Sequence, residues 1–234
     1  MELILVRHGQ PAWSTPDRRN RNDPPLTELG HAQAKLAAAR IADPDDEPAR
    51  GPVDHLIASP ALRAAQTAEP IGAALDQEVV THAWLLEIQN PPHWEGSPIE
   101  DIEAAYAEVR HRTREQVWDG LPGGEPIRSF HQRITEGLRT YLAGLDVVPS
   151  DTVGLWEVGP GAPERVVAVA HAGTNSTIIA HLLGVAPEPW EWDRFLLGHA
   201  SVAILRTTRM AGAHIWSLAA LGDATHLPVE ERTL

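Results

Sequence analysis

The two most strand-like stretches of the sequence each lead into a histidine. Residues 3–6 read Leu-Ile-Leu-Val and are followed by Arg7 and His8, and the apolar run at 165–170 is followed by His171. Such runs predict buried parallel strands, and ligands of open α/β sheets bind beyond the carboxyl ends of the strands. Arginine offers a planar fork to oxyanions, and histidine serves as nucleophile, general base or metal ligand. The spacing predicts that these side chains meet at one rim of a sheet.

Two further features indicate that this rim binds an anion. After His171 the chain reads Ala172-Gly-Thr and then takes a helical pattern, and the N–H groups at a helix N-terminus attract negative charge. Arg63 falls in the first turn of another predicted helix, with Ser59 as its N-cap and Pro60 at its first position. A cation there is disfavoured by roughly 0.3 kcal/mol or more. Arginines and histidines converging with a helix N-terminus predict a phosphate pocket.

Helical and extended patterns alternate around these residues, which predicts one α/β domain over residues 1–234 with a largely parallel sheet. Thr27 is the predicted N-cap of a helix over 28–42, and an acidic, proline-rich loop follows at 43–52. Further helices are predicted at 59–75 with a kink or end at Pro70, from 98 to about 118 after a Ser97–Glu100 capping box, at 127–145, and after His171. Extended segments are predicted at 53–59, 78–88, 165–170, 201–207 and 213–219, and residues 147–164 as a loop with at most one short strand.

The composition limits the classes of partner. Acidic residues outnumber basic ones by 32 to 19, and the formal net charge is −13. This charge argues against bulk binding to nucleic acid or an anionic membrane, so a phosphate site must be a local group of arginines. The chain has no cysteine, which excludes disulfides, thiol catalysis and zinc–thiolate sites. No stretch approaches the ~18 apolar residues of a membrane span, and we expect a cytoplasmic protein.

The remaining histidines, three tryptophans and three arginines each have a functional and a structural interpretation. No histidine pair has the His-Glu-x-x-His spacing of a zinc helix and no loop is of the calcium type, so we expect no metal. Trp94, Trp190 and Trp192 lie near loops that could wall a substrate cleft, although tryptophan more often packs in a core. Arg110, Arg112 and Arg114 are better interpreted as a solvated helix face, although one of them could reach a substrate.

Five ordered segments resemble the motifs of the histidine phosphatase superfamily, also called phosphoglycerate-mutase-like. They read LVRHGQ, PLTELGHAQA, SPALRAAQTA, LLEI followed by WEG, and VAHAG, and the match runs from residue 3 to about 184. The resemblance implies a three-layer α/β/α sandwich with a mostly parallel central sheet. It also implies a helical lid inserted at about residues 90–145, and no cofactor.

The resemblance further implies a role for each matching residue. His8 would be the nucleophile, forming a phosphohistidine through Nε2 while its other ring nitrogen donates to the backbone. Arg7, Arg63 and His171 would hold the non-bridging oxygens of the phosphoryl group. Glu87 would protonate the leaving oxygen and then activate water. These roles agree with the demands of phosphoryl transfer, which needs positioning and positive charge more than covalent chemistry.

The sequence departs from the family pattern at two positions. Many members carry Asn shortly after the Arg-His-Gly motif as a further phosphate ligand, whereas the matching residue here is Ser14. A serine hydroxyl reaches less far, and Asn20 or Asn22 could compensate from the same loop. Ala172 replaces a common glycine after the second histidine, and its contribution to phosphate binding would come from the backbone.

Three functions stay open at this point. The Arg-x-Tyr-Gly type run that follows the acidic residue in cofactor-dependent mutases is absent, since the chain reads LLEIQNPPHWEG. The prediction is therefore metal-independent phosphomonoester hydrolysis, with a small phosphorylated metabolite as substrate and Glu95 as the alternative proton donor to Glu87. A phosphoglycerate-type mutase and a non-catalytic phosphate-binding module are the alternatives. A homodimer stays open, and no nucleic-acid or membrane partner is expected.

Overall fold

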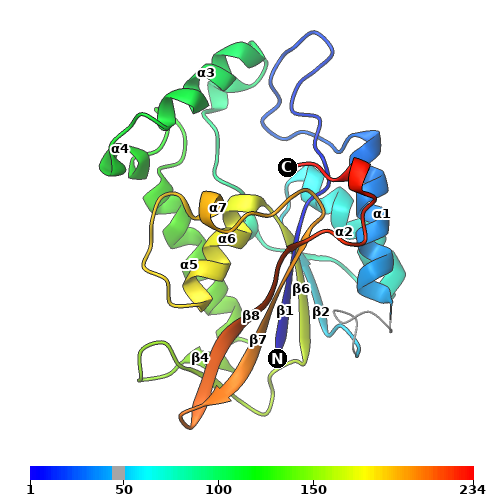
Figure 1. The fold of residues 1–234 in the computed structure, drawn as a ribbon, viewed down its shortest axis with the longest axis vertical. Helices are drawn as coiled ribbons and strands as arrows, with labels where there is room; N and C mark the ends of the chain where they lie inside the picture. The colour runs from blue at the N-terminus through cyan, green and yellow to red at the C-terminus, as the bar shows by residue number, and fades with distance from the viewer. Residues whose placement is uncertain (44–50) are drawn as a thin grey trace.

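The computed structural model describes residues 1–43 and 51–234, so that the loop predicted at 43–52 lies largely outside the described residues. Its strands are β1 (Glu2–Arg7), β2 (His55–Ala58), β3 (Val80–Thr81), β4 (Val147–Pro149), β5 (Trp156–Val158), β6 (Arg165–Ala170), β7 (Val202–Met210) and β8 (Ala213–Asp223). They form a single eight-stranded sheet in the order β3-β2-β6-β1-β7-β8-β5-β4 (Figure 1). The described helices are α1 (Glu28–Ala42), α2 (Leu62–Leu75), α3 (Ile99–Val109), α4 (Arg114–Trp118), α5 (Ile127–Ala143), α6 (Ala172–Leu182) and α7 (Glu191–Arg194), with one-turn 3₁₀ helices at Ala83–Leu85, Pro92–Trp94 and Val229–Glu231.

The sheet is parallel in one half and antiparallel in the other. β3, β2, β6 and β1 pair in parallel, whereas β7, β8, β5 and β4 continue the sheet with antiparallel pairs. The prediction of a mostly parallel sheet is therefore right for one half only. Ala211 and Gly212 both have positive φ between β7 and β8, which is the two-residue hairpin turn that forces antiparallel pairing. Two short strands, β4 and β5, also replace the loop predicted at 147–164.

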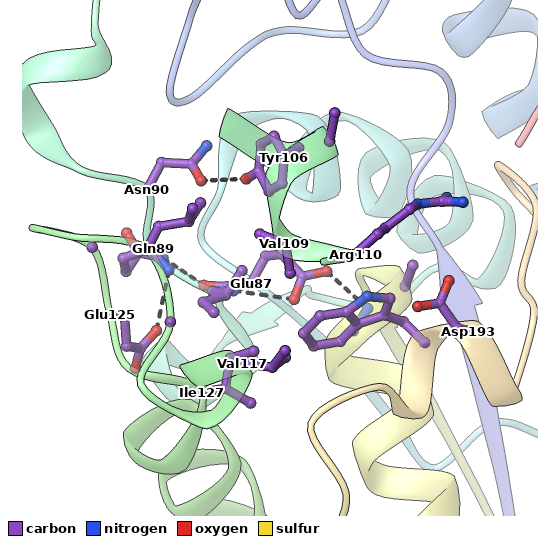
Figure 2. Close-up of a pocket in the computed structure, with 18 of the residues that line it drawn as sticks. Glu87, Gln89, Asn90, Tyr106, Val109, Arg110, Val117, Glu125, Ile127 and Asp193 are labelled. Atoms are coloured by element: carbon purple, nitrogen blue, oxygen red, sulfur yellow. Dashed lines mark hydrogen bonds between the residues drawn. The ribbon is translucent and has the colours of Figure 1, made fainter. Parts of the chain in front are cut away.

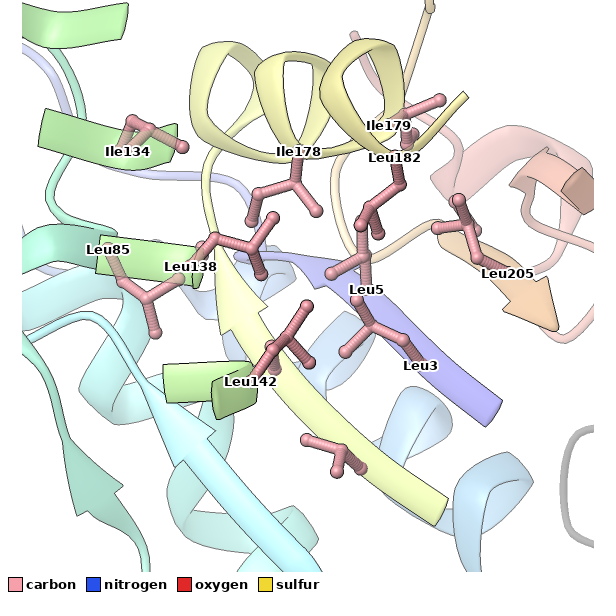
Figure 3. Packing of buried hydrophobic residues seen from close by; sticks show 14 of the residues in the cluster. Leu3, Leu5, Leu85, Ile134, Leu138, Leu142, Ile178, Ile179, Leu182 and Leu205 are labelled. Atoms are coloured by element: carbon pink, nitrogen blue, oxygen red, sulfur yellow. The ribbon is translucent and has the colours of Figure 1, made fainter. Parts of the chain in front are cut away.

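Helices cover both faces of this sheet, which confirms the three-layer α/β/α sandwich. Along β1, Ile4 and Val6 pack with α1 and α2, while Leu3 and Leu5 pack with α5 and α6 on the other face (Figure 3). This alternation is the two-residue period of a strand buried on both sides. Each fully buried Leu or Ile contributes about 1.5–3 kcal/mol, so β1 is firmly fixed between the layers, and the position of its carboxyl end is fixed with it.

Two of the predicted helix starts on the α1 and α2 side can be compared with the structure. Thr27 caps α1 as predicted, because its Oγ1 accepts a hydrogen bond from the Gly30 N–H at 3.0 Å. Ser59 and Pro60 do not begin α2, whose N-cap is Ala61. Asp23 Oδ1 instead accepts the Leu62 N–H at 2.9 Å, so a side chain from a neighbouring loop satisfies the helix start.

Of the predicted kink or end at Pro70, the end is wrong, since α2 continues to Leu75. A proline inside a helix costs about 3 kcal/mol because it removes one hydrogen bond and crowds the preceding turn. Ala64, Ala68 and Ile71 of the same helix are fully buried against the sheet. This packing outweighs the cost of the proline.

The segment predicted as one helix from 98 to about 118 is divided into α3 and α4. The first helix ends at Val109, and Thr113 begins the second, because it forms a capping box with Gln116. The predicted Ser97–Glu100 capping box is absent: α3 begins after Pro98 with no side-chain cap, Ser97 donates to the His93 carbonyl, and Glu100 pairs with Arg18. The extended segment predicted at 78–88 is likewise short, as β3 has two residues before the 3₁₀ turn.

The predicted lid segment, residues 90–145, has two parts with different surroundings. α3 and α4 stand beyond the carboxyl ends of the parallel strands (Figure 1), and each buries a single residue, Ile102 and Trp118. α5 buries five residues and belongs to the sandwich layer. Within the described ranges, no helix is both long and apolar enough to cross a bilayer.

Candidate active site

His8 and His171 meet at the rim formed by the adjacent parallel strands β1 and β6. Their ring centroids lie 5.1 Å apart, and the two residues are 2% and 0% exposed. His8 Nδ1 lies 2.8 Å from the Gly9 carbonyl oxygen, so this nitrogen carries the ring proton and donates. Nε2 of His8 then keeps its lone pair, towards which Arg63 Nε donates at 3.3 Å. The geometry prepares Nε2 of His8 as a nucleophile.

The turn after His8 is fixed by close backbone contacts. A Cβ atom on Gly9 would overlap the carbonyl group of Gly30 in the first turn of α1, and one on Gly30 would overlap the backbone of Gln10. The Gly9 N–H donates to Thr67 Oγ1 on α2 at 3.0 Å. The glycines of the LVRHGQ and PLTELGHAQA motifs therefore allow the His8 turn to pack directly on both helices.

Two arginines flank the His8 ring, of which Arg63 is buried and Arg7 is partly buried. Arg7 Nη1 donates to the Leu197 carbonyl at 2.6 Å, and its Nε is buried without a hydrogen-bond partner among the described residues. Burial lowers the pKa of Arg7 to about 10, so it stays charged at neutral pH. Arg63 is 4% exposed, lies over the Trp13 ring at 4.9 Å and has Nη1 3.6 Å from Asp23 Oδ1. Both guanidinium groups can hold an oxyanion next to His8.

Ser59 orients the second histidine. Its Oγ lies 2.8 Å from His171 Nε2, while His171 Nδ1 is buried without a hydrogen-bond partner in the described chain. If the Ser59 hydroxyl donates to Nε2, the proton of His171 lies on Nδ1, where it can be donated to a bound oxygen. Ser59, predicted as a helix cap, is therefore a hydrogen-bond partner of His171 instead.

Burial and charge keep both histidines neutral. The pKa of His8 is well below its ordinary value, first because of burial and then because of His171, Arg63 and Arg7. Burial is also the main cause of the lowered pKa of His171, with the two arginines adding to it. A neutral imidazole is the nucleophilic form, and the lowered pKa keeps His8 in that form at neutral pH.

Glu87 reaches the same rim from the segment after the 3₁₀ turn. Its Oε2 accepts the Gly173 N–H at 2.9 Å and its Oε1 the Ile88 N–H at 3.1 Å. Burial raises the pKa of this carboxyl, against the smaller lowering effects of the two N–H groups, Arg63 and Arg7. A Cβ on Gly173 would crowd Oε1 of Glu87, so the helix start and the carboxyl fit together only with glycine there. A carboxyl with a raised pKa is suited to general acid–base work.

The structure does not join the other candidate ligands to this cluster. Ser14 is exposed and pairs through its backbone with Asn20. The Asn20 side chain donates to the Trp94 carbonyl and to Asn22 Oδ1, and Glu95 is exposed and accepts the Asn22 N–H at 2.7 Å. These contacts connect the 14–22 loop to residues 91–95. None of the hydrogen bonds just described reaches His8. Ala172 does begin α6 beside His171.

Sequence reasoning missed His199, which lies just before β7. Its Nε2 is 3.0 Å from Arg7 Nη2 and its Nδ1 is 2.8 Å from Thr233 Oγ1. Burial, with a contribution from Arg7, lowers the pKa of His199 to about 3, so a neutral ring accepts from Arg7 and donates to Thr233. The antiparallel pairing of β7 with β1 places the beginning of β7 at the end of β1. Knowledge of this pairing would have been needed to place His199 beside Arg7.

Arg133 on α5 was also missed. Its Nη1 donates to the carbonyl oxygens of Trp84 and Leu86 at 3.1 and 2.9 Å, and its Nη2 lies 2.7 Å from Glu125 Oε2. Glu125 Oε2 also accepts the Gln89 N–H at 3.1 Å. Arg133 therefore fixes the backbone on both sides of Glu87.

A cavity of about 720 Å³, here called the lid cavity, opens beside Arg7, Glu87 and Ala172. Its walls come from α3, α4, the loop before α5, the start of α6, and α7 with the residues after it (Figure 2). Trp192 lines the cavity, whereas Trp94 and Trp190 do not. Across the described residues, no three or more His, Asp or Glu side chains are grouped so that they could hold a metal ion.

The chain belongs to the histidine phosphatase superfamily, since the model of its branch 1 matches residues 3–216. A probable phosphoglycerate mutase of Photorhabdus laumondii is 31% identical, with 97% of this chain and 95% of that protein covered. Phosphoserine phosphatase 1 of Hydrogenobacter thermophilus is 32% identical over 57% of this chain and 61% of its own length. Among solved structures, mycobacterial glucosyl-3-phosphoglycerate phosphatase with inorganic phosphate superposes with a TM-score of 0.69, 25% identity, and coverage of 97% of this chain and 99% of that one. The superfamily neighbours thus include both phosphatases and proteins named as mutases.

Proposed function

We propose that this protein hydrolyses phosphomonoesters through a phosphohistidine on His8. The observation that carries the proposal is the neutral His8 ring, with its Nδ1 proton held by the Gly9 carbonyl and its Nε2 facing Arg63. Phosphoryl transfer depends chiefly on such positioning and on positive charge around the transferred group. Arg7, Arg63 and His171 supply that charge and the donors.

The reaction has two displacements. In the first, Nε2 of His8 forms a bond to phosphorus while the bond from phosphorus to the ester oxygen breaks, and Glu87 gives its proton to the leaving oxygen. In the second, Glu87 accepts a proton from water as the water oxygen attacks phosphorus, and the phosphorus–nitrogen bond breaks to release inorganic phosphate. Arg7, Arg63 and the Nδ1 proton of His171 hold the non-bridging oxygens through both steps.

A phosphoglycerate-type mutase is the second candidate, favoured by the names of relatives that are 26% and 31% identical over 97% of this chain. A mutase must exclude water from the phosphohistidine and return the phosphoryl group to a substrate. Against this stands the open cavity of about 720 Å³ beside Glu87, which admits water. A non-catalytic phosphate-binding module is disfavoured because nucleophile, cations and carboxyl are all in place.

The first experiment is hydrolysis of p-nitrophenyl phosphate with EDTA present, for the wild type and His8→Ala. We expect the substitution to lower kcat/KM on the order of 10³-fold or more, because it removes the nucleophile. His31→Ala, at an exposed position of α1, is the matched control and should behave as wild type. Activity that survives in His8→Ala would contradict the proposal.

The mutase alternative is tested on the same preparations. Conversion between 2- and 3-phosphoglycerate is measured with and without 2,3-bisphosphoglycerate. The proposal predicts slow release of inorganic phosphate and no isomerisation in either case. Isomerisation that depends on the bisphosphate, with little phosphate released, would make the protein a mutase.

A further inference from the structure

The lid cavity is the part of the site that would surround the leaving group. It is lined by Glu87, the proposed proton donor, and by residues of α3, α4 and α7, whereas His8 does not line it. Figure 2 shows Val109, Val117 and Ile127 grouped around Glu87. Leu121, Trp192 and Leu196 are among the other apolar residues that line the cavity. A group attached to the ester oxygen would therefore meet mainly hydrocarbon and aromatic surface.

The size of the cavity indicates a bulky leaving group. Its volume of about 720 Å³ lies in the ~300–1,000 Å³ range of pockets that enclose ligands with several rings or a long chain. A three-carbon acid such as glycerate or serine would leave most of these walls in contact with water. The binding free energy that the walls can supply is then gained only by a larger apolar group.

The charged groups of the cavity offer little to a carboxylate. Arg7 is held by the Leu197 carbonyl and His199, and Arg112 donates to the Gly120 carbonyl at 2.8 Å. Arg110 is exposed, so solvent weakens its attraction for an anion.

The acidic side chains of the cavity also disfavour binding of a carboxylate. Glu87 and Asp193 line the cavity, and Glu125, which also lines it, is paired with Arg133. A leaving group that carries a carboxylate would give up water for a wall whose inner cation, Arg7, is assigned to the phosphate oxygens, and such desolvation is unfavourable. An uncharged apolar group avoids that cost.

We infer that the preferred substrates are phosphomonoesters of uncharged, bulky apolar alcohols, such as arylalkyl or medium-chain alkyl phosphates, rather than phosphorylated hydroxy or amino acids. The inference rests on the proposed function, because the cavity receives the leaving group only if phosphate occupies the His8 rim. Val109, Val117 and Ile127 are then the residues that select the substrate.

The test compares esters whose leaving alcohols are all primary, so that leaving-group chemistry changes little along the series. The kcat/KM values of 3-phenylpropyl phosphate, O-phosphoserine, 3-phosphoglycerate and methyl phosphate are measured by phosphate release. We expect 3-phenylpropyl phosphate to exceed both acids by about tenfold or more. Val117→Asn, which puts an amide in the apolar wall, should lower the ratio of kcat/KM for 3-phenylpropyl phosphate to kcat/KM for methyl phosphate about tenfold. Val153→Asn is the matched control, since Val153 is fully exposed and outside the cavity.

The outcomes separate this inference from the proposed function. If O-phosphoserine or 3-phosphoglycerate is hydrolysed as fast as the phenylpropyl ester, and His8→Ala abolishes hydrolysis, the inference is wrong and the proposed function stands. If no ester is hydrolysed, the proposed function is wrong, and calorimetric titration of the wild type with the same esters decides the inference. Tighter binding of 3-phenylpropyl phosphate than of O-phosphoserine would support it, and equal or weaker binding would overturn it.

Discussion

The rim of the sheet and the lid cavity meet at Glu87, and they are built in opposite ways. At the rim, His8, Arg63 and His171 are almost fully buried and are fixed by strand pairing, by Ser59 and by glycine contacts that tolerate no Cβ. In the lid, α3 and α4 bury one residue each. Elements with few buried contacts open at low free energy. Under the proposed function, the sheet would hold the phosphoryl group, whereas the lid would contact the group attached to it.

The two regions also differ in polarity. The rim gathers arginines and neutral histidines in a buried place, where each charge acts strongly on a bound oxyanion. The lid presents apolar side chains around a space open to solvent. Substitutions at the rim should therefore affect all substrates, and substitutions in the lid should change the preference among them.

The largest effect is expected at the boundary, in Glu87→Gln. The amide cannot give a proton to an alkoxide, so kcat/KM for an alkyl phosphate should fall about 10²–10⁴-fold. p-Nitrophenyl phosphate should lose much less in kcat/KM, because its leaving group departs without a proton. Steady-state kinetics on both esters give the comparison, and an equal loss on the two would show that Glu87 is not the acid.

The pH profile tests the same carboxyl in the unmodified protein. Burial raises the pKa of Glu87, so the proton donor is present below that pKa and is lost as the pH rises through it. The pKa of His8 is lowered, so the nucleophile becomes protonated only well below pH 6.5. We expect kcat/KM for an alkyl phosphate to fall on the alkaline side, by about tenfold per pH unit. This alkaline fall should be missing in Glu87→Gln, and a wild-type profile flat to alkaline pH would contradict the assignment.

A smaller effect, on the binding of inorganic phosphate, is expected when the contact between His199 and Arg7 is removed. His199→Leu removes the acceptor 3.0 Å from Arg7 Nη2, and leaving that buried donor unpaired costs about 1–3 kcal/mol. The Ki of inorganic phosphate should rise about tenfold, and His199→Asn should restore part of the binding through its amide oxygen. Thermal melting of each variant separates this effect from unfolding. An unchanged Ki in a folded His199→Leu would exclude a positioning role.

The sequence allowed the rim to be predicted because two strand ends and a helix start follow general rules. Apolar runs located β1 and β6, and parallel neighbours end at the same edge, so His8 and His171 could be placed together without coordinates. Glu87 was found only through the resemblance, because the 3₁₀ turn and two-residue strand before it leave no periodic signal. The family match, over residues 3–216, includes all of these segments.

What escaped prediction depends on contacts between distant parts of the chain. Arg133 acts on carbonyls that precede it by more than forty residues, and no local pattern reports such a bond. His199 reaches Arg7 only because β7 runs antiparallel beside β1. The start of α4 has a local cause, the capping box of Thr113 and Gln116, which the helical pattern over 98–118 does not reveal.

The central claim, that the phosphoryl group passes through His8, is tested most directly by trapping the covalent enzyme. The wild type is mixed with p-nitrophenyl phosphate, quenched within milliseconds and digested under conditions that preserve phosphohistidine, and the peptides are analysed by mass spectrometry. The account predicts one phosphoryl group on the His8 peptide, more of it in Glu87→Gln because water attack is slowed, and none in His8→Ala. Turnover by the wild type, with no phosphorylated His8 peptide in the wild type or in Glu87→Gln, would contradict this claim.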